Sequence, residues 1–152
     1  MSWRARLSEL GIELPQTAAP LAAYVPAVRT GNLVYTSGQL PIADGKLART
    51  GKVGGADVSP EDAYALARTC ALNALAAVDA LVGLDSVTRV VKVVGFVASA
   101  TNFNGQPAVV NGASELLGQI FGEAGAHARS AVGVSELPLD APVEVELIVE
   151  IR

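Results

Sequence analysis

The 152-residue chain is long enough for one domain that buries roughly 68–70% of its unfolded surface in a single core. Hydrophobic residues make up 51% of the chain and charged residues 17%, against about 25% charged in a typical soluble domain, so we expect another copy of the chain to cover part of its surface. The net charge of −4, with lysines and arginines scattered singly, argues against a nucleic-acid-binding protein, which needs clustered positive charge.

The sequence offers few residues for disulfide or metal chemistry. Cys70 is the only cysteine and His127 the only histidine, so neither an internal disulfide nor a recognisable metal-ligand cluster is predicted. Charged residues interrupt the first ten positions too often for a signal sequence, and no stretch approaches the ~20 uninterrupted apolar residues of a membrane span. We therefore expect a cytoplasmic protein, with residues 1–152 forming one domain that uses no cofactor.

The N-terminus has the spacing of a short helix. Trp3, Leu7 and Leu10 recur at helical intervals, which predicts an amphipathic helix over residues 3–10 that packs its tryptophan on the rest of the domain. We interpret this helix as a structural clasp within an N-terminal extension, residues 1–19, whose last part is a proline-bearing connector.

Strand signals and turn signals then alternate. Two β-rich runs, residues 24–29 and 33–37, flank the turn signal Thr30-Gly31-Asn32 and predict a hairpin. Residues 42–58 are polar and contain several glycines, so we expect a loop there with at most a brief strand near Val53.

The segment Ser59-Pro60-Glu61-Asp62 has the features of a helix start: an N-cap hydroxyl, a proline in the first turn and two acids at the positive end of the helix dipole. The predicted helix runs to about Val82, and Gly83 provides a stop signal. Its apolar stripe, in which alanines allow close approach to a sheet, consists of Tyr64, Ala67, Ala71, Ala74, Val78 and Leu81. Cys70 lies beside this stripe, and we interpret it as buried filler rather than a reactive thiol.

The second half of the chain completes a mixed fold. Residues 89–98 have valines on both faces, which predicts a central strand covered on both sides. A second amphipathic helix is predicted over residues 109–121, ended by Gly122, and two strands follow it. This order predicts an α+β domain: a twisted sheet with two helices packed on one face and the other face available for assembly.

The two terminal strands carry the best candidates for chemistry. One face of the last strand is apolar, whereas the other carries carboxylates, which are costly in a sheet unless they are wetted, paired or used. The residues of that second face are Glu144, Glu146, Ile148 and Glu150. In the preceding strand, Arg129 leads a face of small residues, Ala131 and Gly133, so we expect its guanidinium to lie beside accessible backbone.

Each charged candidate also has a structural interpretation. Arg129 clamps a carboxylate or phosphate if its fork faces an open pocket, and is an ion-pair partner if it faces Glu150 or another acid. Glu144 and Glu146 either hold a water or take a proton, or are solvated residues on the outer face of a sheet, which is the commoner case.

Two uncharged candidates lie at strand ends. Ser37-Gly38 either presents a hydroxyl and a bare backbone N–H to a ligand or simply ends a strand, and strand termination is the commoner role. His127 is a loop residue next to a strand, a position that is more often incidental than catalytic.

Three segments resemble the signatures of the RidA (YjgF) family. They are Tyr24 with Gly31-Asn32-Leu33-Val34-Tyr35-Thr36-Ser37-Gly38-Gln39-Leu40-Pro41, then Ala128-Arg129-Ser130-Ala131-Val132-Gly133-Val134 with Leu137-Pro138, and finally Pro142-Val143-Glu144-Val145-Glu146. Members of the family are reactive-intermediate enamine/imine deaminases, some still labelled endoribonuclease L-PSP or translation inhibitor. The resemblance runs from about residue 20 to the C-terminus, and the longer N-terminus and the 42–58 loop look like those of a long-chain subgroup.

The resemblance implies a chorismate-mutase-like fold and a homotrimer with ligand clefts between subunits. It also implies roles for single residues. Arg129 matches the arginine that clamps the substrate carboxylate, and Glu144 the glutamate that positions a water for attack at the imine carbon. Tyr24 matches a pocket tyrosine, Ser37-Gly38 an edge that contacts the substrate, and Ala131 a position whose backbone contacts it.

Strand geometry suggests how these residues could meet. If the last two strands form a hairpin that turns near Leu139, Arg129 pairs near Glu150 and Glu144 lies roughly 20 Å away along its strand. A site that uses both side chains would then need two chains. Two departures from the short members lie beside the implied pocket: His127 stands where proline is common, and Val25-Pro26 follows Tyr24 where Ser-Gln is usual.

The first functional hypothesis is hydrolysis of 2-aminoacrylate-type enamine or imine intermediates to 2-keto acids and ammonia. Such substrates are already electrophilic, so an enzyme needs mainly to hold a carboxylate, orient a water and move a proton. The alternative is a trimeric small-carboxylate-binding or regulatory protein that turns over poorly. An endoribonuclease is disfavoured by the acidic charge balance.

Overall fold

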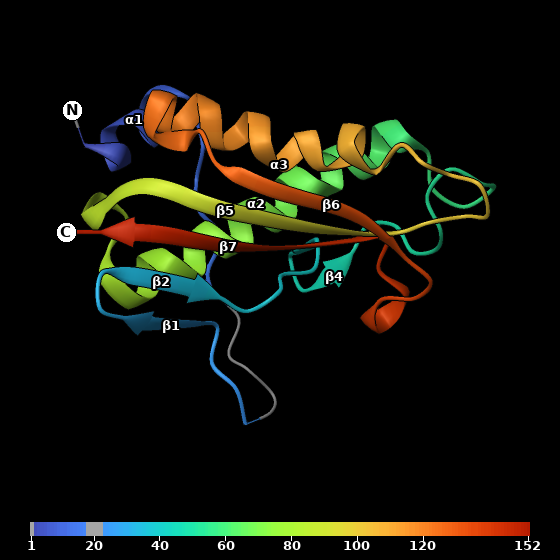
Figure 1. The fold of residues 1–152 in the computed structure, drawn as a ribbon, viewed down its shortest axis with the longest axis horizontal. Coiled ribbons are helices and arrows are strands. Elements are labelled where there is room, and N and C mark those ends of the chain that lie inside the picture. The colour runs from blue at the N-terminus through green and yellow to red at the C-terminus, as the bar shows by residue number, and fades with distance from the viewer. Residues whose placement is uncertain (1, 18–22) are drawn as a thin grey trace.

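The computed structural model describes residues 2–17 and 23–152. Residue 1 and residues 18–19 of the predicted N-terminal extension, with the end of its connector, lie outside these ranges. One mixed five-stranded sheet, in the order β1-β2-β7-β5-β6, is the centre of the domain (Figure 1). Its strands are β1 (Ala27–Thr30), β2 (Leu33–Thr36), β5 (Val87–Ala98), β6 (Ala128–Val134) and β7 (Val143–Ile151).

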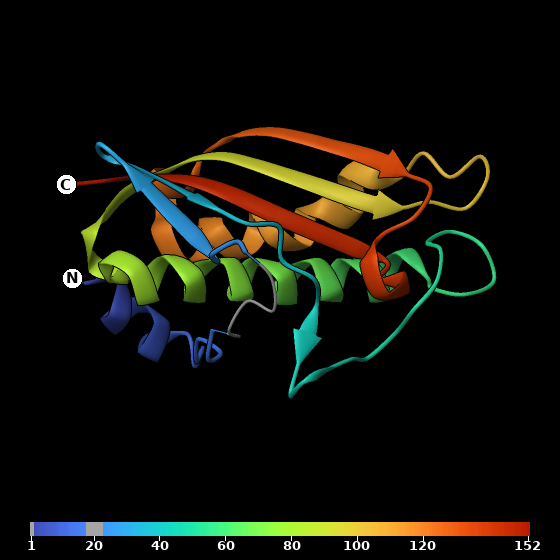
Figure 2. The same cartoon turned by 90° about the horizontal axis from the view of Figure 1, so that it is seen from below.

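Both long helices lie on the same side of this sheet (Figure 2). They are α2 (Pro60–Val82) and α3 (Gln106–Phe121). Their apolar side chains and the inward-facing valines of β5 and β7 form one core, and the opposite face of the sheet has no helix over it among the described residues. The predicted α+β class, with two helices on one face, is therefore confirmed.

Helix α2 follows its local signals. The Ser59 hydroxyl accepts a hydrogen bond from the Asp62 backbone N–H at 3.1 Å, and Gly83 ends the helix with a φ of 80°. The alanines of its predicted stripe are fully buried, but Leu81 at its end is 46% exposed, which corrects that part of the stripe. By length and composition α2 could cross a membrane; it packs instead on the sheet and on α3 as a core helix.

Cys70 lies on the buried side of α2, and its Sγ is 3.7 Å from the Val143 carbonyl oxygen. Burial, and then the negative charge of Glu144, raise the pKa of this thiol well above its usual value. The thiol is therefore neutral filler in the core, as the sequence predicted.

The loop over residues 42–58 contains a small hairpin that was not predicted. It pairs β3 (Ile42–Ala43) with β4 (Lys46–Leu47) around Asp44-Gly45, whose φ angles of 54° and 79° suit a tight hairpin turn. The predicted brief strand near Val53 is present as isolated bridges, one of them to Ser99 beyond the end of β5.

The order of the last strands corrects the predicted hairpin. β6 pairs in parallel with β5, and β7 pairs antiparallel with the other edge of β5, so β5 lies between the two terminal strands (Figure 1). The connection over residues 135–142, which includes the short helix η3 (Pro138–Asp140), crosses the end of β5 instead of turning directly back. A direct hairpin would need a loop of about two to five residues.

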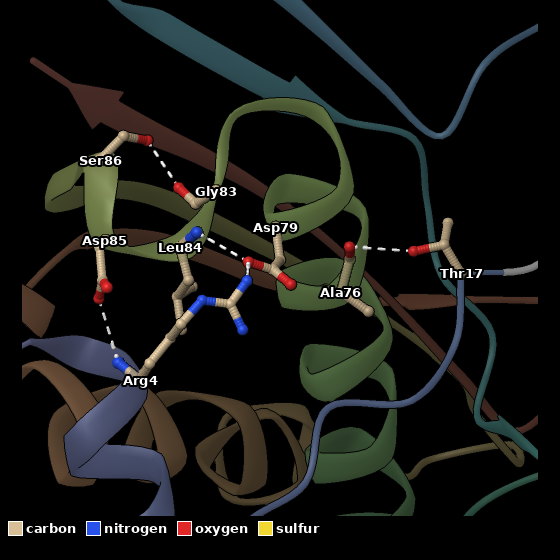
Figure 3. A network of polar contacts seen from close by, with 8 residues as sticks. All are labelled: Arg4, Thr17, Ala76, Asp79, Gly83, Leu84, Asp85 and Ser86. Atoms are coloured by element: carbon tan, nitrogen blue, oxygen red, sulfur yellow. Dashed lines mark hydrogen bonds and ion pairs between the residues drawn. The ribbon is translucent and has the colours of Figure 1, made fainter.

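The N-terminal helix α1 (Trp3–Glu9) fastens onto the end of α2 and the start of β5. The Trp3 indole N–H donates to the Val87 carbonyl oxygen at 2.7 Å. The Arg4 guanidinium lies 2.5 Å from Asp79 Oδ1, and the Arg4 backbone N–H donates to Asp85 at 3.1 Å (Figure 3). Farther along the chain, Thr17 donates to the Ala76 carbonyl at 2.9 Å. These contacts fit the structural clasp that the sequence predicted.

Candidate functional site

Arg129 lies on β6, at the open edge of the sheet and on the helix-covered face. It is paired with Val93, whose side chain is fully buried under the helices. Its Nη1 donates to Asn111 Oδ1 at 2.7 Å and to Ser114 Oγ at 3.2 Å. Since Asn111 and Ser114 are three residues apart on α3, they form one polar surface on that helix. The guanidinium is thus held between the helix and the edge strand by two uncharged groups.

The remaining donors of Arg129 have no partner among residues 2–17 and 23–152. No carboxylate oxygen of this part of the chain lies within 4.0 Å of the guanidinium. The alternative of an ion pair with Glu150 is therefore wrong within one chain, and Glu150 instead accepts a hydrogen bond from the Thr88 hydroxyl at 3.1 Å. Because both recorded hydrogen bonds use Nη1, Nε and Nη2 remain available for a two-point contact with an anion.

His127 is linked to Arg129 through the Ser114 hydroxyl. Its Nε2 is 2.9 Å from Ser114 Oγ, and its Nδ1 is 2.6 Å from the Gly125 carbonyl oxygen. Sequence reasoning treated His127 as incidental and missed Asn111 and Ser114. Their signal was a polar pair at helical spacing beside the apolar stripe of α3, opposite a strand that begins with an arginine.

The small residues after Arg129 lie close to side chains of the helix-covered face. Ala131 and Gly133 face the helices, where Ala131 packs on the core. A Cβ added to Gly133 would lie 2.7 Å from Gln106 Nε2 and 3.0 Å from Ser99 Oγ. Gly133 is nevertheless exposed and Ala131 half-buried, so accessible backbone beside Arg129 stays a prediction. Any backbone contact of Ala131 with a ligand must be made along the outer edge of β6, which no described strand pairs.

Glu144 lies on the other face of the sheet. It is on β7 opposite Phe96, and its side chain rests directly on Gly38: a Cβ there would be 1.9 Å from Glu144 Oε2. The backbone of Gln39 pairs with Val145 through hydrogen bonds of 2.8 and 3.0 Å, which holds Gly38 beside the carboxylate. Only a glycine leaves room for that carboxylate in this position.

The environment of Glu144 favours a proton on its carboxyl group. Burial, and then the negative charge of Glu146, raise the pKa of Glu144 above its usual value. No lysine, arginine or histidine nitrogen of the described residues lies within 4.0 Å of it. The group is therefore a stronger proton acceptor than an ordinary glutamate.

Ser37 ties the Tyr24 segment to this region. Its hydroxyl donates to the Val25 carbonyl at 2.6 Å and its backbone N–H to the Pro26 carbonyl at 2.8 Å. The hydroxyl proton is thus used locally, and the oxygen remains an acceptor. Tyr24, next to Val25, is 57% exposed.

We call Arg129, Asn111, Ser114 and His127 the arginine half-site, and Glu144, Gly38, Ser37 and Tyr24 the glutamate half-site. Strand register places Arg129 across from Val93 and Leu147, so Glu144 is two strands and three residues away, roughly 14 Å, on the opposite face. The two half-sites therefore share no pocket within one chain. An apolar hollow of about 520 Å³ lies elsewhere, between β1 and the C-terminal half of α2.

The arrangement can bind an anion at one half-site and handle a proton at the other. Among the described residues, no group of three or more histidine, cysteine or acidic side chains is placed to hold a metal ion. Neither half-site has a counter-charge of its own, which is unusual for partly buried charged groups and typical of sites that bind a ligand.

Several known proteins are similar to this chain. The family described as Endoribonuclease L-PSP matches residues 15–151. Protein TCP17 of Trypanosoma cruzi is 46% identical, over 97% of this chain and 93% of its own. A 2-iminobutanoate/2-iminopropanoate deaminase of Escherichia coli is 37% identical, over 86% of this chain and 88% of its own.

Two solved structures extend the comparison. A crystal structure of the protein Atu1372 of Agrobacterium tumefaciens, of unknown function, superposes with a TM-score of 0.90 at 48% identity, covering 99% of this chain and 92% of that one. E. coli TdcF, crystallised with bound serine, superposes with a TM-score of 0.63 at 27% identity, covering 90% and 94%. With the motifs of Arg129 and Glu144 set in this fold, the chain belongs to the Endoribonuclease L-PSP family, the RidA/YjgF family that its sequence resembles.

Proposed function

We propose that the protein is a hydrolase that converts 2-aminoacrylate and 2-iminopropionate-type intermediates to 2-keto acids and ammonia. The observation that carries this proposal is the pair of uncompensated charges, Arg129 with a free two-donor edge and Glu144 with a raised pKa. Relatives named as 2-iminobutanoate/2-iminopropanoate deaminases support a RidA-type function, and the serine bound to E. coli TdcF supports a small carboxylate as ligand.

The chemistry needs only these groups and a water. Nε and Nη2 of Arg129 hold the substrate carboxylate, with the backbone of Ala131 along the strand edge beside it. Glu144 orients a water and takes its proton as the oxygen attacks the imine carbon. That proton passes from Glu144 to the imine nitrogen, which gives a neutral carbinolamine. Glu144 then takes the hydroxyl proton of the carbinolamine and returns a proton to its nitrogen, so the C–N bond breaks, ammonia leaves and the C=O bond forms. Tyr24 and Ser37-Gly38 line the substrate side of the pocket.

We propose that two copies of the chain build each site within a homotrimer. Arg129 of one copy and Glu144 of the next then face one substrate, which removes the problem that the two lie on opposite faces of one sheet. The same assembly would cover the half-buried valines on the outer face of β5. Action in the cytoplasm stays a prediction.

The first test follows the loss of freshly generated 2-iminopropionate with a trapping amine. We expect the wild type to accelerate hydrolysis over buffer, and Arg129→Ala and Glu144→Ala to fail while remaining folded and assembled like the wild type. A wild type that does nothing across several imino acids would contradict the deaminase proposal.

The alternative is a carboxylate-binding or regulatory protein that turns over poorly. The retained anion-binding edge of Arg129 and the serine-bound relative favour it as second candidate. Both functions predict binding of small carboxylates, but only the enzyme needs Glu144 for turnover. An endoribonuclease is a weaker candidate because the net charge is −4; RNA cleavage by a nuclease-free Arg129→Ala preparation would support it.

A further inference from the structure

The arginine half-site contains a hydrogen-bond chain that the proposed reaction does not itself use. It runs from Arg129 to Ser114, from Ser114 to His127, and from His127 to the carbonyl of Gly125, at 3.2, 2.9 and 2.6 Å. All four residues come from different local elements: β6, α3, the segment before β6 and the short helix η2 (Gly122–Gly125). The hydrogen-bond chain therefore links four elements of the fold, one after another.

The donor and acceptor of each hydrogen bond follow from the Gly125 carbonyl at the end of the chain. A carbonyl oxygen can only accept, so Nδ1 of His127 carries a proton and donates to Gly125. In the neutral imidazole Nε2 is then an acceptor, and the Ser114 hydroxyl must donate to it. The hydroxyl oxygen therefore turns its lone pairs toward Nη1 of Arg129. Without His127, the Ser114 hydroxyl would be free to rotate.

The end of this chain is fixed by packing. Gly125 is buried, and a Cβ added to it would lie 2.4 Å from the Leu117 carbonyl oxygen, so η2 sits tightly against α3. The carbonyl that accepts from His127 consequently has a defined position.

We propose that Ser114 and His127 are positioning residues that orient the Arg129 guanidinium, so that its Nε and Nη2 edge points to the carboxylate of the substrate. This inference rests on the proposed function of Arg129 as a carboxylate clamp. Asn111 fixes one hydrogen of Nη1 and Ser114 the other, which stops the planar group from turning about its long axis. Both partners are neutral, so they leave the positive charge of the guanidinium available to the ligand. A carboxylate partner would neutralise that charge.

The test measures binding of 2-oxobutyrate, a product-like carboxylate, by titration calorimetry. We expect Ser114→Ala to weaken binding about tenfold and His127→Ala somewhat less, as for other supports of ligand-binding side chains. In imine hydrolysis the same variants should raise KM by a similar factor and leave kcat within about twofold, because the glutamate half-site is untouched. Thr69→Ala, which removes a hydroxyl from the other long helix, is the matched control and should change neither.

Double variants separate positioning from a general structural role. The Ser114→Ala/His127→Ala double variant should bind no more weakly than Ser114→Ala, and neither change should matter in an Arg129→Ala background. Equal binding by wild type, Ser114→Ala and His127→Ala, or additive losses that persist without Arg129, would overturn the positioning role alone. Failure of the wild type to bind any small carboxylate would overturn the proposed function as well, so the two failures are distinguishable.

Discussion

The two half-sites hold their charges in opposite ways. Arg129 donates directed hydrogen bonds to uncharged side chains, whereas Glu144 is partly buried and lies in close contact with a glycine. The first arrangement leaves the cation fully charged, and the second makes the anion easier to neutralise. Placed side by side in one chain, these groups would form an ion pair that binds nothing. The sheet keeps them apart on opposite faces, so that each remains available to a ligand or to another copy.

The strongest test of this separation mixes two inactive variants. Arg129→Ala and Glu144→Ala chains, unfolded and refolded together in equal amounts, should recover about a quarter of wild-type imine hydrolysis if each site takes one residue from each of two copies. The reason is statistical: one site in about four pairs an intact arginine with an intact glutamate.

The control for this mixture is the double variant Arg129→Ala/Glu144→Ala, refolded with wild type in the same proportions. Mixed trimers that stay as inactive as their parents would mean that both residues serve a site within one chain, against the separation seen in the sheet.

Replacing the arginine by lysine tests the fork itself. Arg129→Lys keeps the charge but loses the planar two-donor edge, so KM for the imino acid should rise roughly 30- to 100-fold. The measurement is steady-state kinetics beside Arg29→Lys, an exposed arginine on β1. If Arg129→Lys retains the wild-type KM, a point charge is sufficient and the two-point clamp is wrong.

The glutamate half-site should respond to a single methyl group. In Gly38→Ala the new Cβ would lie 1.9 Å from Glu144 Oε2, so the carboxylate must move away. We expect kcat to fall about tenfold with little loss of thermal stability, because the displaced atom is the end of a flexible side chain.

Gly118→Ala is the matched control for this methyl group. Its new Cβ meets nothing within 4 Å, so activity should be unchanged and the helix slightly stabilised, by about 0.5–1 kcal/mol. Full activity in Gly38→Ala would show that the position of Glu144 on Gly38 does not matter.

What the sequence predicted correctly was set by local signals. The Ser59 cap and the Gly83 stop mark α2 at both ends, because capping depends on neighbouring residues alone. The placement of β5 between the terminal strands was missed, since strand order depends on contacts distant in sequence. The helix side chains that hold Arg129 were missed for the same reason: periodicity identifies the apolar side of α3, but not which strand residue meets its polar flank.

The smallest expected effect concerns stability and pH. The pKa of Glu144 is raised in the folded state, so ionising this group stabilises the unfolded chain more than the folded one. The protonated Glu144 carboxyl therefore makes its full contribution to folding stability below the unfolded-state pKa of about 4.3. This contribution is lost as the pH rises through the higher pKa of the folded state. Glu144→Gln has no such loss, so the variant should gain stability relative to the parent between about pH 4 and 7.

The measurement is chemical unfolding at several pH values, with and without Glu144→Gln, in an Arg129→Ala background. In that background no neighbouring copy can place the Arg129 guanidinium beside Glu144. We expect Glu144→Gln to be more stable than its parent at pH 7 and equally stable near pH 4, with a small difference because the side chain is only partly buried. With Arg129 intact, the gain should shrink or reverse, because the neighbouring guanidinium favours the ionised carboxylate. A gain that is the same in both backgrounds would mean that the two charges never meet, and the cross-subunit site would have to be abandoned.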